Sequence, residues 1–248
     1  MQILHGDCLE IMPRLIAKDS IDLILADVPY GQTQNDWDQP IPFGPMWGQL
    51  LRVAKPNAAI ILMAAQPFAS KLICSNIDDF RYDLIWKKNK PTGFLNSKKQ
   101  PLRVHEHILV FYRKLPFYVP QMTTGHKPGN YAKRIKPSTN YGTQTPTEYG
   151  GSTERYPTSV LEIPIINNDD PDKHHPTQKP VDLMAWLMRS YSEPGMTILD
   201  FSAGAGTTAI AAMRENRKCI CIEKELRYVE IASARIADES PLFHAKAA

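Results

Sequence analysis

Apolar runs alternate with segments of helical period over the first 115 residues. Residues 20–27 (SIDLILAD) and 58–65 (AAIILMAA) have the pattern of buried strands, and residues 45–54 between them have a helical pattern. A second helical segment follows at 68–75, and two more apolar runs lie at 82–88 and 105–114. Repeated alternation of this kind predicts an α/β fold, with a mostly parallel sheet and helices on both faces.

The alternation stops near residue 115 and resumes after residue 171. Residues 116–171 are rich in Gly, Pro, Ser, Thr, Asn and Tyr without a sustained period, which predicts loops or short hairpins. The last part predicts, in order, a helix, a strand, a helix, a strand and a helix, at 181–193, 195–202, 207–217, 218–223 and 225–237. We therefore divide the chain into residues 1–115, a loop-rich insert at 116–171, and residues 172–248.

Charge is distributed unevenly along a chain whose net charge is only +3. Between Asp83 and Glu148 there are twelve Lys and Arg residues and one acid, Glu106, whereas the rest has 17 bases and 25 acids. Aromatic residues are interleaved with these bases, a pattern that favours nucleic-acid contact. Eight basic side chains are candidate DNA contacts: Lys88, Lys90, Lys98, Lys99, Lys127, Lys133, Arg134 and Lys136.

The cysteines and the apolar segments argue against a metalloprotein, a membrane protein and a secreted protein. Cys8, Cys74, Cys219 and Cys221 lack the paired spacing of a metal site, and the last two lie in a strand-like run. We expect reduced thiols and no metal. No apolar stretch approaches the about 18 residues of a membrane span. The start, MQILHGDCLE, lacks the order of a secretory signal. The sequence therefore predicts a soluble cytoplasmic protein, of a bacterial cell or a phage-infected host, with no membrane partner.

Two strand ends carry the candidate chemistry. The run at 21–26 ends in Asp27, Val28, Pro29 and Tyr30, at the sheet edge where open α/β folds bind ligands. The run ending at Asp200 leads into a glycine-rich turn and then a helix, and the next strand ends in Glu223, where an acid can bind ribose hydroxyls. The turn lacks the Lys of a phosphate-binding loop. A nucleoside ligand without a polyphosphate is therefore expected, and S-adenosylmethionine fits.

The order of these motifs resembles the β-class of amino-group DNA methyltransferases. Members have an Asp/Asn/Ser-Pro-Pro-aromatic tetrapeptide, a target-recognition region and then a glycine-rich cofactor loop. This chain has DVPY, the basic insert, HPTQKP at 175–180 and LDFSAGAGTT at 199–208. It departs from the pattern in Val28, where Pro is usual, and in Phe201-Ser202, where Pro-Phe is common. The resemblance spans nearly the whole chain and implies a Rossmann-like S-adenosylmethionine-dependent methyltransferase fold with circularly permuted motif order. It makes 1–115 the catalytic half, 116–171 the target-recognition insert and 172–248 the cofactor-binding half.

The same resemblance implies roles for individual residues. Asp27 and the carbonyl of Val28 would accept the hydrogens of the target amine, Pro29 would hold the turn, and Tyr30 would stack on the flipped base. Glu223 would bind the ribose, Asp7 the adenine amine of the cofactor, and Cys8 would line that pocket. Thr177 and Lys179 would meet the methionine carboxylate. The loop under the methionine part would be formed by Asp200, Phe201, Ser202, Gly204, Gly206 and Thr207.

The function predicted from these motifs is transfer of a methyl group from S-adenosylmethionine to N6 of a flipped adenine in double-stranded DNA. Asp27 favours adenine, because cytosine-N4 members tend to have Ser there, and N4-cytosine methylation is the first alternative. An RNA or protein methyltransferase usually places the glycine loop before the tetrapeptide, and a non-catalytic nucleic-acid binder would not need intact motifs. The resemblance also brings a homodimer and a cognate restriction endonuclease into consideration as partners.

Overall fold

The computed structural model describes residues 1–33, 35, 38–129, 132–133 and 148–240 and divides the chain into two compact units. The first unit comprises Met1–Val119 and Ser159–Ala248, and the second is Pro120–Thr158. The second unit contains a two-stranded antiparallel pair, β6 (Ala132–Lys133) with β7 (Glu148–Tyr149), and an isolated bridge between Thr123 and Arg155. The insert expected at 116–171 is wider than this unit, because residues 116–119 and 159–171 belong to the first unit.

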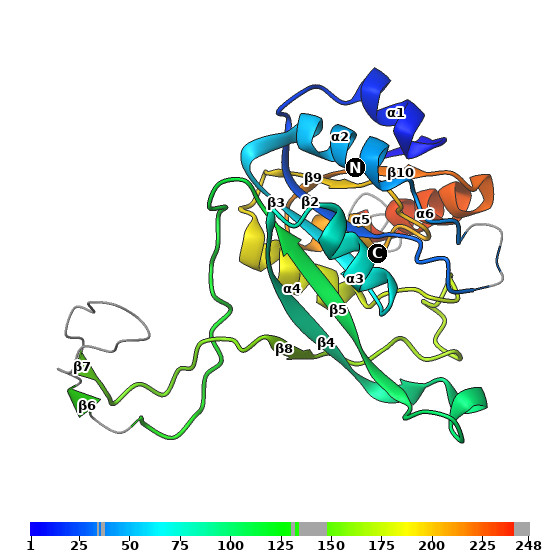
Figure 1. Cartoon of the computed structure of the whole chain (residues 1–248). Coiled ribbons are helices and arrows are strands. Elements are labelled where there is room, and N and C mark those ends of the chain that lie inside the picture. Colours follow the sequence, from blue (N-terminus) through cyan, green and yellow to red (C-terminus); the bar gives the residue numbers. More distant parts are fainter. Residues whose placement is uncertain (34, 36–37, 130–131, 134–147, 241–248) are drawn as a thin grey trace, which may run out of the picture. The chain divides into compact units, whose positions relative to one another are not determined.

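An eight-stranded sheet forms the centre of the first unit (Figure 1). Its spatial order is β1 (Gln2–His5), β10 (Lys218–Glu223), β9 (Thr197–Asp200), β2 (Ile21–Asp27), β3 (Ala54–Ala64), β5 (Arg103–Phe111), β4 (Phe80–Thr92) and β8 (Val160–Glu162). The first five strands are parallel, β5 is antiparallel to β3 and β4, and β8 is parallel to β4. The predicted, mostly parallel α/β sheet is confirmed.

The exception to the parallel pattern is the β4–β5 hairpin. Alternation along the chain favoured parallel strands here too, but no crossover helix lies between these two. A parallel connection needs a dozen or more residues, usually with a helix. The short connection at 93–102 contains only the 3-10 turn η1 (Phe94–Asn96), so the chain returns as an antiparallel hairpin.

Helices cover both faces of the sheet because successive strand residues point to opposite sides. Ile24 of β2 packs with α1 (Cys8–Leu15), α2 (Phe43–Val53) and α3 (Phe68–Ser75). Leu25, the next residue, packs in a second core with α4 (Val181–Tyr191) and α5 (Thr207–Arg214), against which α6 (Leu226–Glu239) also lies. None of the helices that the structure describes is long and apolar enough to cross a membrane.

Gly206 illustrates how close the helices approach. It precedes α5 with φ +76°, and a Cβ there would lie 2.8 Å from the Cβ of Ala232 on α6. We expect Gly206→Ala to lower the free energy of unfolding by about 2 kcal/mol, through backbone strain and overpacking. Gly48→Ala in α2 is the matched control, because its Cβ would meet nothing within 4 Å, and it should stabilise the helix by up to about 1 kcal/mol. Urea titration measures both, and equal effects of the two variants would contradict this account.

Candidate active site

A cavity of about 1050 Å³ opens at the carboxyl ends of β1, β10, β9 and β2. All four tetrapeptide residues line it, as do Asp7, Cys8, Thr177, Lys179, Asp200, Phe201, Ser202, Gly204, Thr207 and Glu223. Gly206 does not line it and instead packs on α6. The structure therefore brings the predicted catalytic residues and nearly all of the predicted cofactor residues to one site.

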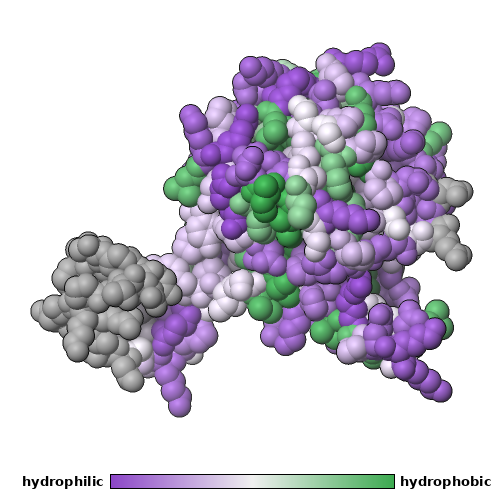
Figure 2. All heavy atoms as spheres, viewed as in Figure 1, coloured by the Kyte–Doolittle hydropathy of each residue, from purple (hydrophilic) through white to green (hydrophobic). Residues whose placement is uncertain are grey.

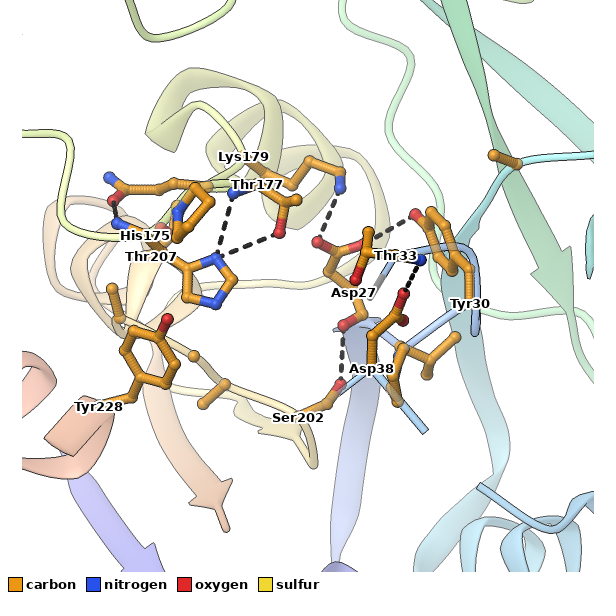
Figure 3. A pocket seen from close by; sticks show the side chains of 18 of the residues that line it. Asp27, Tyr30, Thr33, Asp38, His175, Thr177, Lys179, Ser202, Thr207 and Tyr228 are labelled. Atoms are coloured by element: carbon orange, nitrogen blue, oxygen red, sulfur yellow. Dashed lines mark hydrogen bonds and ion pairs between the residues drawn. The ribbon is translucent and has the colours of Figure 1, made fainter. Parts of the chain in front are cut away.

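Asp27 lies at the centre of a network of polar side chains (Figure 3). Its Oδ1 accepts a 2.8 Å hydrogen bond from the Tyr30 hydroxyl, and its Oδ2 accepts one of 2.7 Å from Lys179 Nζ. Lys179 comes from the segment before α4 and is only 6% exposed. The structure thus places the Lys179 ammonium group on the predicted catalytic acid. The predicted contact of Lys179 with a methionine carboxylate stays a prediction.

Glu106 is a site residue that the sequence analysis did not identify. Its Oε2 lies 3.3 Å from Lys179 Nζ, and its Oε1 accepts a 2.5 Å hydrogen bond from Lys88 Nζ. The Lys88 and Glu106 side chains are only 8% and 13% exposed. Two carboxylates and two ammonium groups therefore form a cluster, which we call the four-charge cluster: Asp27, Lys179, Glu106 and Lys88. Its side chains are between 6% and 25% exposed, and its formal charges cancel when all four groups are ionised. Glu106 is the single acid among twelve bases, and this isolation was the one sequence feature that could have identified it.

Burial and charge shift the pKa values in this cluster. Burial raises the pKa of Asp27, and the charge of Glu106 adds to this while Lys179 opposes it. Burial alone would also raise the pKa of Glu106, but Lys179 and Lys88 lower it to about 2. Burial disfavours the charged form of Lys179, yet its two carboxylate partners raise the pKa above its ordinary value. Glu106 is therefore ionised and Lys179 protonated at neutral pH.

The Tyr30 ring and the following loop form one wall of the site. The ring stacks on Phe68, with centroids 5.4 Å apart and an interplanar angle of 27°. Asp38 is buried and accepts hydrogen bonds from the backbone N–H groups of Gly31, Gln32 and Thr33. Although burial opposes it, these bonds lower the pKa of Asp38. A charged carboxylate therefore holds the loop that leaves the tetrapeptide.

The glycine-rich loop after β9 is joined directly to the tetrapeptide. The Ser202 hydroxyl donates a 3.0 Å hydrogen bond to the backbone carbonyl of Asp27, and the Ser202 N–H donates one of 3.1 Å to Asp200 Oδ1. Burial raises the pKa of Asp200 to about 7, and hydrogen bonds from Thr208 and Ser202 oppose the shift. The residue that departs from the usual Pro-Phe pair thus connects the two motifs.

Glu223 shapes the same loop from the neighbouring strand. Its Oε2 accepts a 2.7 Å hydrogen bond from the Gly204 N–H, and its Oε1 accepts one of 2.8 Å from the Glu225 N–H. Asp7 lies after β1, caps α1 by accepting a 2.9 Å bond from the Leu9 N–H, and also lines the cavity. A capping role for Asp7 and a place in the cavity are thus both observed. Burial raises the pKa of the neighbouring Cys8 thiol to about 12.

The HPTQKP segment forms the wall opposite Tyr30. The Thr177 hydroxyl lies 3.1 Å from His175 Nδ1, and the His175 ring packs on Tyr228 with centroids 4.4 Å apart (Figure 3). Burial, with the nearby charges of Lys179 and Arg227, lowers the pKa of His175 to about 4. His175 is therefore neutral at physiological pH and does not add positive charge to this wall.

The candidate DNA contacts fall into three groups. Lys88 and Lys90 both line the cavity. The Lys88 ammonium group is buried on Glu106, whereas Lys90 is exposed and donates a hydrogen bond to Asn167. Lys98, Lys99 and Lys127 are exposed. Arg134, Lys136 and the side chain of Lys133 lie outside what the structure describes. Three cysteines are buried and Cys74 is exposed, and the described residues contain no group of three or more His, Cys, Asp or Glu that would hold a metal.

Solved DNA methyltransferases have the same fold. The chain superposes on PvuII DNA methyltransferase, described as cytosine-N4-specific, with a TM-score of 0.68 and 16% identity over 96% of this chain and 90% of that one. The M1.HpyAVI complex with SAM gives a TM-score of 0.62 and 22% identity over 94% and 98% of the two chains. The chain therefore belongs to the class of proteins that have the Rossmann-like fold of these two structures.

Sequence comparison identifies the family within that class. A family model described as DNA methylase, for N6 and N4 enzymes, matches residues 21–234. The chain therefore belongs to the N6/N4 DNA methylase family. It is also 26% identical over 250 residues to the DNA adenine methyltransferase YhdJ of Escherichia coli (strain K12), covering 94% of this chain and 82% of that protein.

Proposed function

We propose that this DNA methyltransferase transfers a methyl group from S-adenosylmethionine to N6 of an adenine flipped out of double-stranded DNA. The observation that carries the proposal is the direct connection between its two motifs. Asp27 and the glycine-rich loop lie at the ends of adjacent parallel strands, joined by the Ser202 to Asp27 hydrogen bond, and face one cavity. A methyl donor and an acceptor amine bound there would lie side by side.

The polar groups that line the cavity fit a nucleoside sulfonium cofactor. Glu223 offers carboxylate oxygens to ribose hydroxyls. Asp7, just after the neighbouring strand β1, offers a hydrogen-bond acceptor to an adenine amine. Asp200 and the backbone around Gly204 would hold the methionine part, with Thr177 on the opposite wall. When bound, this cofactor supplies an electrophilic methyl group on a positively charged sulfur, and the electrons of the broken carbon–sulfur bond would stay on sulfur in the product, S-adenosylhomocysteine.

Asp27 would act on the exocyclic amine of the target base. The lone pair of that amine is delocalised into the ring, so the amine is a weak nucleophile. Accepting its hydrogens at Asp27 and at the Val28 carbonyl localises the lone pair and stabilises the positive charge that develops on nitrogen. The proton released during methylation would pass to Asp27 Oδ1 or Oδ2. Burial favours its arrival by raising the pKa of Asp27, and Lys179 favours its subsequent departure.

Tyr30 would offset part of the cost of flipping the base. Taking a base out of the duplex costs roughly a few kcal/mol, and stacking on an aromatic ring returns about 1–3 kcal/mol. The ring already has a fixed orientation because it stacks on Phe68 and its hydroxyl is bound to Asp27. It therefore needs little ordering when a base binds.

Two features support adenine over cytosine as the target. Asp27 is the acid that the resemblance associates with adenine enzymes, and the relative YhdJ is named a DNA adenine methyltransferase. The cytosine-N4-specific PvuII enzyme, which has the same fold, makes N4-cytosine the competing assignment. A homodimer and a cognate restriction endonuclease stay predictions from the resemblance.

Glu223→Gln should raise the dissociation constant of S-adenosylmethionine at least tenfold. The variant loses a negative charge and one acceptor oxygen facing the cavity, so a ribose hydroxyl loses its partner. Glu230→Gln, on the exposed side of α6, is the matched control and should leave the affinity unchanged. Calorimetric titration measures both, with thermal unfolding to verify the fold. A Glu223→Gln affinity within about twofold of the wild type would exclude the ribose role.

The proposal as a whole is tested by incubating the purified protein with unmethylated plasmid DNA and tritiated S-adenosylmethionine. We expect label in the DNA at a defined sequence, which sequencing of the modified positions would identify. Cofactor binding with no label in any DNA would contradict the proposed function and favour a nucleic-acid binder with an inactive site.

A further inference from the structure

Strands β4 and β5 form a projecting hairpin (Figure 1), and the connection between them contains an exposed apolar pair. Phe94 is 63% exposed and Leu95 is 101% exposed, and both belong to the single turn η1. Figure 2 shows hydrophobic and strongly hydrophilic side chains next to each other at this end of the molecule. Adjacent large apolar side chains without packing partners are costly in water and commonly mark a binding surface.

The turn that carries the pair is ordered by its own backbone. Gly93 has φ +90°, and its carbonyl accepts a 2.9 Å bond from the Asn96 N–H. The Lys99 N–H donates to the Asn96 carbonyl at 2.8 Å, and the Thr92 hydroxyl donates to the Arg103 carbonyl across the hairpin at 3.2 Å. Phe94 and Leu95 are therefore presented on a defined turn, and their exposure does not come from an irregular loop.

The surroundings of the pair are basic and lie at the cavity. Lys98 and Lys99 are exposed in the same connection, and no acid occurs from residue 87 to residue 105. Thr92, Gly93 and Arg103, where the two strands lead into the tip of the hairpin, line the cavity that contains Asp27. The exposed apolar pair is therefore next to the rim of the cavity through which a target base would enter. The positive charges of Lys98 and Lys99 beside the pair are complementary to a phosphate backbone.

We propose that this hairpin tip, residues 93–99, is a wedge that enters the DNA base stack beside the target nucleotide. Phe94 and Leu95 would occupy the space that the flipped base leaves, and Lys98 and Lys99 would bind the flanking phosphates. Apolar side chains that insert between base pairs partly unstack them. The unstacking costs about a few kcal/mol per base step, and other protein–DNA contacts offset this cost. The inference rests on the proposed function, because a wedge is needed only where a base leaves the duplex.

The test uses the double variant Phe94→Ala/Leu95→Ala on two duplexes that contain the methylation site found by plasmid sequencing. In one duplex the target adenine is paired, and in the other it faces an abasic position, so that opening costs less. We expect kcat/KM to fall at least tenfold on the paired duplex and to stay within about twofold of the wild type on the abasic one. S-adenosylmethionine affinity should not change.

The matched control is Ile77→Ala/Leu115→Ala, which removes two exposed apolar side chains from other parts of the unit. It should behave as the wild type on both duplexes. An unchanged rate of the tip variant on the paired duplex, or an equal loss on both duplexes, would overturn the wedge. A wild-type protein that sediments as a dimer and becomes a monomer in the tip variant would overturn it in favour of a contact between copies.

Failure of the proposed function gives a different pattern. A wild-type protein that labels no plasmid DNA contradicts methyl transfer itself and gives no methylation site. The wedge is then decided by unstacking in a duplex of mixed sequence that contains 2-aminopurine, whose fluorescence rises when it is unstacked. The fluorescence should rise when the wild-type protein binds and not when the tip variant binds, and an equal rise with both proteins would overturn the wedge.

Discussion

Asp27→Ala should lower kcat by about 10²–10³ while leaving the fold and S-adenosylmethionine affinity nearly unchanged. The magnitude is that of removing one preorganised electrostatic contact to a developing charge. It should appear in kcat, because the contact to the amine strengthens mainly in the transition state. The fold should survive because Lys179 keeps Glu106 at 3.3 Å and is not left without an acid.

Asp27→Asn gives a graded companion to this variant. It keeps one acceptor oxygen and the side-chain shape but loses the charge, so its rate should lie between those of the wild type and Asp27→Ala. Single-turnover methylation with saturating cofactor measures the three rates, and calorimetry measures cofactor binding. An Asp27→Ala protein with the wild-type single-turnover rate would contradict the assigned role of this carboxylate.

Glu106→Ala should lower the free energy of unfolding by about 3–5 kcal/mol, the cost of breaking a buried ion pair. Lys88 would lose the carboxylate oxygen 2.5 Å from its Nζ, and Lys179 would keep Asp27 alone. Glu162→Ala is the matched control, since its pair with Lys87 is well exposed and should contribute less than about 1 kcal/mol. Urea unfolding measures both variants.

Two further results follow from the same cluster. The double variant Glu106→Gln/Lys88→Met removes one charge of each sign, so it should recover much of the stability lost in Glu106→Ala. Because the pKa of Glu106 is lowered from 4.5 to about 2, its stabilising contribution is complete above pH 4.5 and is lost as the pH falls toward 2. Similar losses in Glu106→Ala and Glu162→Ala would contradict the four-charge cluster.

The strand ends at the site could be predicted because local patterns determine them. One buried run ends in Asp27 and another ends in Asp200, and the alternation of strands and helices predicts that the two strands are parallel. Parallel strands have their carboxyl ends at the same edge of the sheet, so the two acids were expected to lie near each other. The glycine turn before α5 likewise follows from Gly204 and Gly206, which have φ +51° and φ +76°. In these places one short stretch of sequence specifies both the element and its end.

The four-charge cluster could not be predicted because it depends on pairing between distant segments. Glu106 lies opposite Trp86 in the β4–β5 register, and only this antiparallel register brings it beside Lys88. Lys179 reaches Asp27 across 152 positions of sequence, because the start of α4 meets the end of β2. Composition indicated that Lys88 was one of many bases on a DNA surface, whereas tertiary packing makes it the partner of a buried acid.

The measurement that tests the central claim most directly is the identity of the methylated nucleoside. DNA treated with the protein and labelled S-adenosylmethionine is digested to nucleosides and separated by chromatography. We expect the label in N6-methyladenine, and in the Asp27→Ala protein a label reduced by orders of magnitude over the same time. Label in N4-methylcytosine without N6-methyladenine would contradict the base assignment, and DNA without any label would contradict the account of the site as a whole.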